Sequence, residues 1–586
     1  MRKGMIVPEK YSPAVREAFL IAVSLAGWFM FDIINLGGGS LSFWRIITNA
    51  VPIYIFGRIL FLLTNSLKAA ALITGISCFL ASVANYYVFL FRGKPIVPWD
   101  LQALGTAVSV MGSYSYDLTW RIGFAFLLLL LLFFALFLIR FENRAKRSVK
   151  ASAVNLLVVT GLTALYASAV YPKLTDSLWD IGSIYEKEGV VAGFLSHCKY
   201  ATYHRPGKYS AKKCRDILDG VVAEGPDETR ISAQNIIVVM NESFADLRVI
   251  GDRVLDGDYM PYVDSMEENE SALKGNLHVS VFGGMTANTE FEVLTGVSCA
   301  YVPAVPYQTV VSRKIRSLAD VLKEQDFYTE AFHPYLAANW ERDKVYPYLG
   351  FDSFLSIESM DVKDEDILRW CVSDYSDYQQ IIRSYEENTA DNFFMFNVTM
   401  QNHGGYADEF EGFSSTVDLS DYGDFKEAEV YLTLVQESDR QLEGLINYFS
   451  EVEEPTLICF FGDHQPYLGD EFLELLYGKR LDDLTTEEKR QQYITPIVLW
   501  SNYGLKEVNL EKISPNYLSA LILKEANLSM PAYESFLWQL YQEYPVISGT
   551  GILDKEGHYY QAIEDVDSEI LTEYGWLQYN RLRSKS

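Results

Sequence analysis

The chain has 586 residues, a formal net charge of -28 and a hydrophobic fraction of 49%. This acidic balance argues against a nucleic-acid partner, because binding a phosphate backbone requires clustered Lys and Arg. The hydrophobic fraction averages two unlike parts. Apolar blocks dominate as far as Tyr171, and an acidic, aromatic-rich globular sequence follows from Pro172. The length therefore predicts a membrane anchor and one large domain.

Five apolar stretches in residues 1–171 are long enough to cross a bilayer, and they predict a transmembrane domain with five helices: 18–34, 46–63, 69–91, 122–139 and 153–171. Basic residues gather at the helix ends on one side, namely Arg2, Lys3, Lys10, Arg16, Lys68, Arg140, Arg144, Lys146, Arg147 and Lys150. The other side has only Arg45, Arg92, Lys94 and Arg121. The positive-inside rule then predicts a multi-pass protein of the cell membrane, with a cytoplasmic N-terminus and an extracellular domain after Tyr171.

Residues 172–230 form a connector whose apolar spacing predicts an amphipathic helix. This helix could lie on the membrane surface or against the outer domain, and the sequence leaves both alternatives open. Cys198 and Cys214 could form a disulfide bridge, although unpaired buried thiols are the favoured interpretation.

Residues 231–545 alternate short β-rich runs with helical patterns, which predicts a mainly parallel sheet covered by helices. The expected strands are 235–240, 328–332, 393–399, 456–461 and 496–500, and the expected helices are 427–449, 515–526 and 532–541. Residues 546–586 are read as a C-terminal extension.

Polar residues follow three of these strands. Glu242 comes after the first, His403 after the third, and Asp463 with His464 after the fourth. Ligand sites of open α/β sheets lie beyond the carboxyl ends of the strands, so these side chains should meet. Two carboxylates and an imidazole suit Mn²⁺, Zn²⁺ or Mg²⁺. Alone, an Asp-His pair is more often a capped turn.

Two glycines and Thr286 precede a predicted helix, in the run Gly283-Gly284-Met285-Thr286. Backbone N–H groups and the helix dipole could face an anionic phosphate there. The competing interpretation is that Thr286 is an ordinary N-cap.

These motifs, in this order after five transmembrane helices, resemble the lipoteichoic acid synthase family of phosphoglycerol transferases, within the alkaline phosphatase and sulfatase superfamily. The resemblance implies a five-helix transmembrane bundle followed by an α/β outer domain of alkaline phosphatase/sulfatase-like type. It makes Thr286 the nucleophile and a metal ligand together with Glu242, Asp463 and His464. It also implies substrate binding by His403, His333, Trp340 and Arg342. Tyr335 stands where the family often has an acidic residue, which leaves the headgroup or acceptor preference open.

The implied reaction moves glycerophosphate from phosphatidylglycerol of the outer leaflet, through a threonine ester, to a glycolipid, polyglycerolphosphate or glycan acceptor. Diacylglycerol is released. The implied cofactor is a divalent metal, Mn²⁺ first, with Mg²⁺ and Zn²⁺ as alternatives. The competing functions are a phosphoethanolamine transferase, a phosphodiesterase or sulfatase-like hydrolase, and a non-catalytic sensor of envelope polymers. The sequence does not distinguish a primase from a polymerase.

Overall fold

The computed structural model describes residues 5–7, 12–38, 42–101, 116–141, 149–175, 181–201, 203–251, 255, 259–266, 271–302, 305–407, 410, 412–506 and 508–583. Its described residues fall into two compact units. The first comprises residues up to Pro98 and Tyr116–Lys199, and most of the second follows from Tyr200. Arg2, Lys3, Lys10, Arg144, Lys146 and Arg147, which entered the prediction of orientation, lie outside the described residues.

The first unit is a bundle of long helices: α1 (Ser12–Asn35), α2 (Phe43–Thr64), α3 (Leu67–Arg92), α5 (Trp120–Leu138) and α6 (Val149–Leu165), which continues as a π-helical turn, Tyr166–Val170. All five spans are long and apolar enough to cross a membrane. Large apolar side chains on α5 remain exposed, including Leu131 at 56% and Phe134 at 62%. Such a surface is stable only in lipid, so the chain is a membrane protein.

A short parallel pairing joins β1 (Met5–Val7) to β2 (Ile139–Phe141). It places the N-terminus and the end of α5 at the same end of the bundle. This arrangement agrees with five antiparallel crossings.

Buried polar groups attach two short helices to the bundle, α7 (Ile181–Glu188) and α8 (Val190–Ser196). Asp32 of α1 and Arg45 of α2 form a buried ion pair at 2.5 Å. Arg45 also donates to the Glu186 carbonyl at 2.9 Å, and Asn49 donates to the Glu188 carbonyl at 2.7 Å. Residues 181–196 of the expected amphipathic connector therefore pack on the helix bundle.

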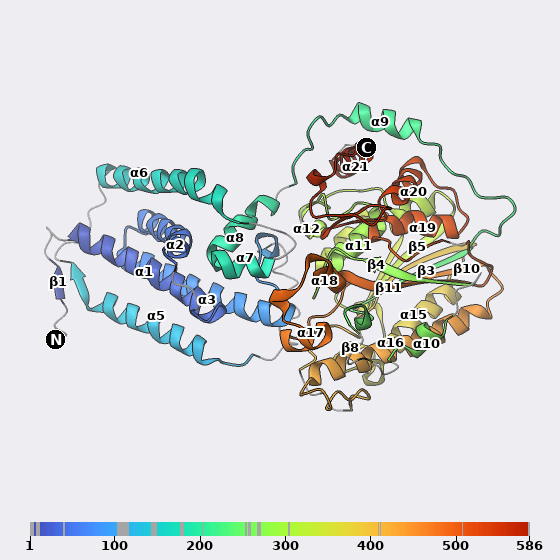
Figure 1. The fold of residues 1–586 in the computed structure, drawn as a ribbon, viewed down its shortest axis with the longest axis horizontal. Coiled ribbons are helices and arrows are strands. Elements are labelled where there is room, and N and C mark those ends of the chain that lie inside the picture. Colours follow the sequence, from blue (N-terminus) through green and yellow to red (C-terminus); the bar gives the residue numbers. More distant parts are fainter. Residues whose placement is uncertain are drawn as a thin grey trace. The chain divides into compact units, whose positions relative to one another are not determined.

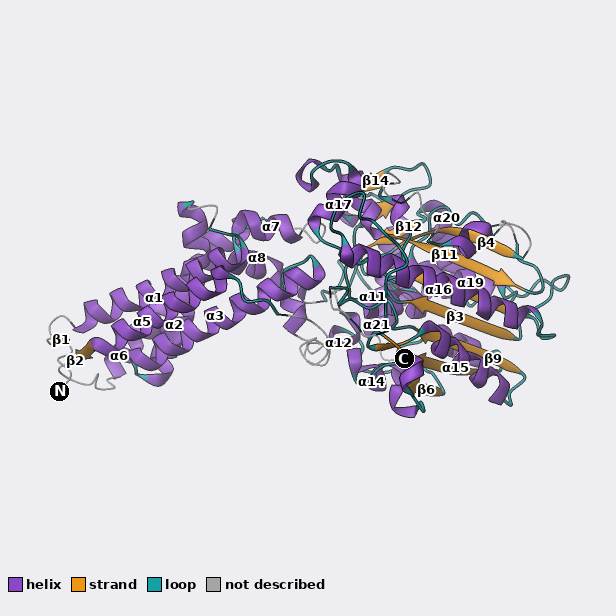
Figure 2. Cartoon of the chain, turned by 90° about the horizontal axis from the view of Figure 1, so that it is seen from below, coloured by secondary structure: helices purple, strands orange, loops and turns teal. Residues whose placement is uncertain are grey.

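The second unit is built on a seven-stranded sheet with the order β4-β11-β10-β3-β9-β5-β6 (Figure 2). Its strands are β3 (Asn235–Asn241), β4 (Ala272–His278), β5 (Phe327–His333), β6 (Ser353–Ser356), β9 (Asn392–Val398), β10 (Thr456–Gly462) and β11 (Ile494–Ser501). Only β11 runs in the direction opposite to the other strands of this sheet, so its pairings with β10 and β4 are antiparallel. The predicted mainly parallel sheet is confirmed, and β4 and β6 are additional strands that the sequence pattern missed.

Helices cover both faces of this sheet (Figure 1). On one face lie α10 (Pro261–Ser265), α15 (Asp374–Glu387) and α16 (Lys426–Ser450). The other is covered by α11 (Thr286–Thr295), α12 (Pro306–Thr309), α13 (Leu318–Lys323), α19 (Leu518–Glu525) and α20 (Ala532–Glu543). Residues 236–240 of β3 are fully buried between these layers. Because the central strands run parallel, their carboxyl ends lie together at one edge of the sheet.

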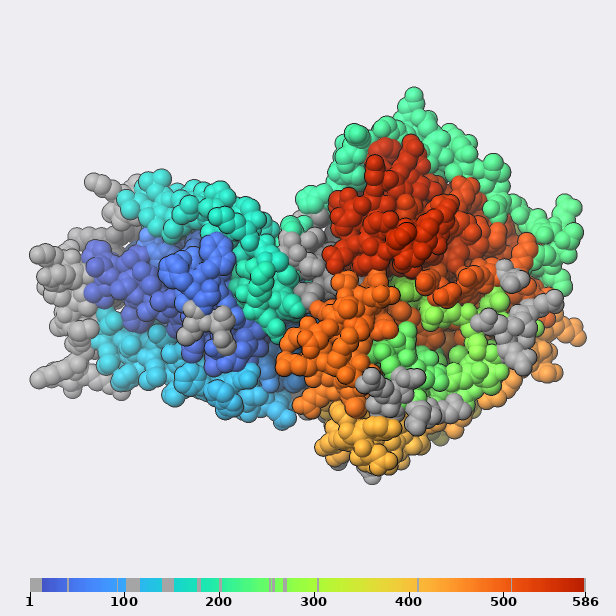
Figure 3. Space-filling model, viewed as in Figure 1, coloured from blue at the N-terminus to red at the C-terminus, as the bar shows by residue number. Residues whose placement is uncertain are grey.

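The remaining elements lie around this core: α9 (Ala211–Gly220), α14 (Arg342–Tyr348), the hairpin β7–β8 (Ile367–Leu368 and Cys371–Val372), α17 (Asp470–Tyr477), α18 (Thr486–Arg490), the small sheet β12–β14 (Val546–Ser548, Gly551–Leu553 and Tyr559–Tyr560) and α21 (Glu569–Arg583). Helix α21 packs on α9, and the C-terminal residues form a continuous surface, red in Figure 3. All six cysteines are free thiols.

Candidate active site

Thr286 is the first residue of α11, and the residue before it, Met285, is held in a strained conformation. Gly283, Gly284 and Met285 all have positive φ values, of 68°, 138° and 75°. A left-handed conformation is costly for Met, and such strain is often found at functional sites. The N-cap of α11 is Met285, and the Thr286 hydroxyl donates to Glu242 Oε2 at 3.2 Å. Thr286 is therefore not the N-cap considered as the alternative.

The loop after β10 holds the start of α11 in place. The Gly283 N–H donates to the Gln465 carbonyl at 2.9 Å, and the Thr289 hydroxyl donates to the Asp463 carbonyl at 2.9 Å. Gly462 ends β10, where a Cβ atom would lie only 1.8 Å from the Phe244 carbonyl oxygen. Glycine is required there because the two loops that carry the site cross at this point.

Glu242, Asp463 and His464 converge beside Thr286, as predicted from the strand ends. Their ligand atoms lie within 4.8 Å of one another, and all three residues are buried. His464 Nε2 lies 3.3 Å from Asp463 Oδ2 and 3.6 Å from Glu242 Oε1. Asp463 Oδ1 accepts the N–H groups of Ser243 and His464, which fixes the carboxylate.

This cluster fits a divalent metal. Asp463 Oδ2 and His464 Nε2 are buried without a hydrogen-bond partner among the described residues, whereas buried polar atoms are almost always paired. Burial raises the pKa of Glu242 well above its ordinary value, and the charge of Asp463 raises it further. Burial also raises the pKa of Asp463. A cation among the three side chains would remove this repulsion.

Two further histidines lie near the cluster. His333, at the end of β5, is buried, and its Nδ1 donates to the Val398 carbonyl at 2.8 Å. Burial lowers the pKa of His333 well below its ordinary value, with smaller effects from Arg342 and His403. Burial and the charge of His464 lower the pKa of His403 to about 4. Both imidazoles are therefore neutral at pH 7, and each has one ring nitrogen that accepts and one that donates.

Arg342 is 1% exposed and forms a buried ion pair with Glu290 of α11. Its Nε lies 3.2 and 3.1 Å from the two Glu290 oxygens. The hydroxyls of Tyr346 and Tyr307 donate to the same carboxylate at 2.7 and 3.2 Å. The neighbouring Glu341 pairs with Lys344 instead.

Trp340 is partly buried against the core of the domain. Trp340 and Glu341 have consecutive left-handed backbone conformations, with φ values of 54° and 59°. Two such residues in a row are unusual outside glycine. The segment that would contact the substrate is thus held in a strained turn before α14.

A buried hydrogen-bond network supports the strand ends from behind. Asn241 donates to Asp374 Oδ2 at 2.7 Å, and Asn402 donates to Asn241 Oδ1 at 2.9 Å. Ser438 of α16 also donates to Asp374. The network holds the residues that directly precede Glu242 and His403. The buried roles of Glu290 and Asp374 could not be predicted from the sequence, since an acidic residue in a helical pattern normally indicates a solvated face.

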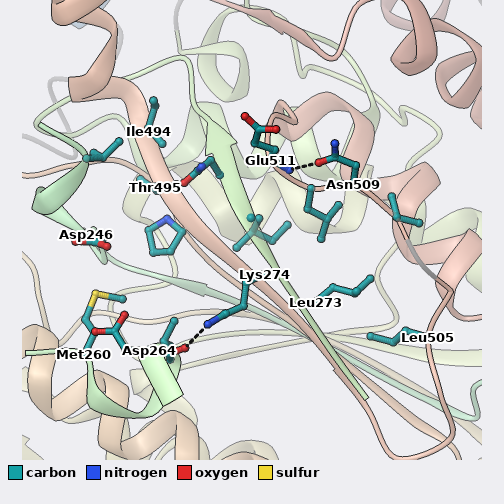
Figure 4. A pocket seen from close by; sticks show the side chains of 18 residues that line it. Asp246, Met260, Asp264, Leu273, Lys274, Ile494, Thr495, Leu505, Asn509 and Glu511 are labelled. Carbon is teal, nitrogen blue, oxygen red and sulfur yellow. Dashed lines mark hydrogen bonds between the residues drawn. The ribbon is translucent and has the colours of Figure 1, made fainter. Parts of the chain in front are cut away.

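A separate cavity of about 890 Å³ lies along β4 and β11 (Figure 4). Its walls include Asp246, Lys274, Thr495 and Asn509, and Lys274 donates to the Val263 carbonyl. None of the predicted catalytic or metal-binding residues lines it. The cavity is therefore not the reaction site.

The mainly parallel sheet, with a threonine at a helix start and acidic and histidine side chains at the strand ends, defines a membrane-bound member of the alkaline phosphatase/sulfatase class. The sulfatase family profile matches residues 234–528, about half of the chain. The chain belongs to the sulfatase family.

Two relatives and one solved structure refine this assignment. A Rhizobium meliloti (strain 1021) protein named for cyclic beta-1,2-glucan modification is 33% identical over 396 residues, covering 65% of this chain but only 59% of that protein. The lipoteichoic acid synthase-like YvgJ of Bacillus subtilis (strain 168) is 24% identical over 474 residues, covering 76% and 73%. The Streptococcus pyogenes phosphoglycerol transferase GacH, in complex with sn-glycerol-1-phosphate, shares the fold at a TM-score of 0.50 and 21% identity, covering 66% of this chain and 96% of that one. The chain is thus similar to lipoteichoic acid synthase-type enzymes of the superfamily.

Cys299, just after α11, is the nearest candidate for the cysteine nucleophile that the sulfatase-like alternative would require. It is buried, and its N–H donates to Glu292. Burial raises the pKa of its thiol well above the ordinary value, which keeps it protonated. The cysteine nucleophile of the sulfatase alternative therefore has no support in this chain.

Proposed function

We propose that this protein is a membrane-bound phosphoglycerol transferase that moves glycerophosphate from phosphatidylglycerol to an acceptor hydroxyl and releases diacylglycerol. The observation that carries the proposal is the Thr286 hydroxyl beside Glu242, Asp463 and His464 at the start of α11. The similarity to YvgJ supports the transferase class. The relative named for glucan modification supports a glycan among the acceptors.

In the first half-reaction, Thr286 Oγ1 forms a bond to phosphorus and the bond from phosphorus to the diacylglycerol oxygen breaks. The proton of the Thr286 hydroxyl passes to that oxygen, so diacylglycerol leaves as an alcohol. Glu242 Oε2 accepts a hydrogen bond from the Thr286 hydroxyl and so orients the nucleophile. The N–H groups at the start of α11 are proposed to bind the phosphoryl oxygens. Neutral His403 can donate an N–H to the phosphate or to the leaving oxygen.

In the second half-reaction, an acceptor hydroxyl attacks the Thr286 ester and the Thr286–phosphorus bond breaks. The proton of the acceptor returns to Thr286. Arg342, fixed by Glu290, and His333 are proposed to bind the glycerophosphate headgroup together with Trp340. A strained turn and a buried ion pair would keep these groups in place before the substrate arrives.

Glu242, Asp463, His464 and Thr286 would hold a divalent metal, for which we propose Mn²⁺, with Mg²⁺ and Zn²⁺ as alternatives. A metal bound there lowers the pKa of the threonine hydroxyl and neutralises charge on the phosphoryl group. The carboxylate and imidazole ligands favour these ions over Ca²⁺, which prefers six to eight oxygen ligands.

We infer that the N-terminus is cytoplasmic and that the catalytic domain is extracellular. The donor lipid would then be met at the outer leaflet, where no nucleotide is available. The transfer needs no nucleotide as an energy source, because the phosphodiester bond of the lipid is exchanged for a phosphodiester bond in the product. The membrane bundle keeps the enzyme at the surface that contains its substrate.

The test uses the full chain in detergent with phosphatidylglycerol and Mn²⁺, and diacylglycerol is measured. Thr286→Ala should lower the rate at least 1,000-fold, on the order expected for loss of a covalent nucleophile. Thr572→Ala, which alters an exposed threonine of α21, is the matched control and should retain activity. EDTA should abolish the reaction, and added metal should restore it.

Equal diacylglycerol release by wild type and Thr286→Ala would refute the nucleophile. Release from phosphatidylethanolamine alone would establish the phosphoethanolamine transferase instead. Binding of envelope polymer without any product would establish a non-catalytic sensor.

A further inference from the structure

A cluster of aromatic side chains lies beside His403. Trp370, in the turn of the β7–β8 hairpin, meets the His403 ring edge-on at 5.3 Å between centroids. Tyr335, just after β5, lies 6.3 Å from Trp370 and 6.4 Å from His333. Both Tyr335 and Trp370 are partly exposed, and the neighbouring Leu336 is 39% exposed. These rings form an apolar surface next to the two histidines of the site.

The indole N–H of Trp370 is buried and has no acceptor among the described residues. A buried indole N–H usually has a hydrogen-bond partner. This N–H is therefore not accessible to a ligand, and the surface meets a ligand with its aromatic faces. A sugar ring has the matching chemistry, since its C–H faces pack on aromatic rings.

The hairpin is held rigidly against the His403 loop. Arg369 donates to the carbonyls of His403 and Gly405, at 3.3 and 2.8 Å. Its guanidinium also stacks on Tyr406 at 5.4 Å. Arg369 adopts a left-handed conformation, with φ at 62°, which turns the hairpin at Trp370. The aromatic surface is therefore positioned with respect to the reacting groups.

The segment before the hairpin is acidic. It contains one lysine, Lys363, among these acidic residues: Glu358, Asp361, Asp364, Glu365 and Asp366. The segment contacts the aromatic surface directly, since the Ile357 N–H donates to the Tyr335 carbonyl at 3.2 Å. An anionic polymer such as polyglycerolphosphate would be repelled here, whereas an uncharged glycan would not.

We propose that Tyr335 and Trp370 form an acceptor subsite for an uncharged carbohydrate, beside His403. The subsite rests on the proposed transferase function and specifies its acceptor class. A sugar ring packs against Trp370, and a sugar hydroxyl attacks the Thr286 ester. The acidic segment discriminates against polyanionic acceptors.

The test supplies labelled phosphatidylglycerol to the full chain with either a linear glucan hexasaccharide or a glycerol phosphate hexamer. More labelled glycerophosphate should be transferred to the glucan than to the glycerol phosphate hexamer. Trp370→Ala should raise the glucan concentration for half-maximal transfer about tenfold, the loss of one aromatic stacking partner. Trp370→Phe, which keeps an aromatic ring for stacking, should raise it less than Trp370→Ala does. Tyr422→Ala, at another exposed aromatic residue, should leave it unchanged.

Binding of the hexasaccharide, followed by saturation-transfer NMR, tests the subsite without the donor lipid. Failure of wild type to bind it, or equal binding by wild type and Trp370→Ala, would overturn the subsite even if diacylglycerol is released. Preference for the glycerol phosphate hexamer would overturn it as well. So would a Trp370→Ala variant with a lower maximal rate but an unchanged glucan concentration for half-maximal transfer. Glucan binding through Trp370 without cleavage of phosphatidylglycerol would support the subsite and refute the proposed function.

Discussion

Replacement of Glu290 by Gln tests whether the buried ion pair with Arg342 stabilises the domain. The substitution preserves the size of the side chain and one acceptor oxygen but removes the charge that compensates the guanidinium. Both side chains of the pair are at most 2% exposed. Removing one partner of such a pair costs about 3–5 kcal/mol, because the remaining charge is buried without compensation.

This free energy can be converted into a melting temperature. Unfolding entropy is about 2.1 cal/mol/K per residue, or roughly 0.8 kcal/mol/K for a domain of roughly 390 residues. Glu290→Gln should therefore lower the Tm of the full chain by about 4–6 °C, measured by intrinsic fluorescence in detergent. Activity should fall as well, because Arg342 would no longer be held toward His333.

Glu324→Gln is the matched control, since Glu324 pairs with Arg316 where the two side chains are 57% and 40% exposed. Exposed pairs contribute about 0–1 kcal/mol. The double variant Glu290→Leu/Arg342→Met should recover most of the lost stability, as apolar replacements of buried pairs do. A Tm shift for Glu290→Gln no larger than that of Glu324→Gln would refute this reasoning.

Two further outcomes are expected. Burial raises the pKa of Glu292, whose Oε1 accepts the Cys299 N–H, from 4.5 to about 8. Protonated Glu292 therefore stabilises the folded state fully below pH 4.5, and this stabilisation is lost as pH rises through 8. The reason is that the Glu292 carboxyl loses its proton at lower pH in the unfolded chain than in the folded one. Glu292→Gln should remove this loss in thermal unfolding between pH 5 and 9; parallel curves for the two proteins would contradict the assignment. The orientation can be tested with Asp117→Cys and Asn65→Cys, each made in a chain that also carries Cys198→Ser. An impermeant maleimide should label Asp117→Cys in intact cells and should not label Asn65→Cys. The reverse labelling pattern would show that the topology is inverted.

Much of the fold could be predicted because its signals are local. Five apolar stretches require a membrane, and the buried parallel strands read as continuous apolar runs. Strand β4 was missed because Lys274, Gly275 and Asn276 interrupt its apolar pattern near the sheet edge. Helix α15 was missed because it buries Asp374 and Asp377, which usually indicate an exposed face.

The sequence by itself determined which residues could do chemistry, since Glu242, Asp463, His464 and Thr286 all follow strands or start a helix in a specific order. Only the tertiary structure showed that Glu290 neutralises Arg342 and that Trp370 lies beside His403. Each pair joins segments far apart in the chain, 52 residues for the first. Periodicity reports on which face a side chain occupies, whereas the partner it meets depends on how the strands are ordered in the sheet.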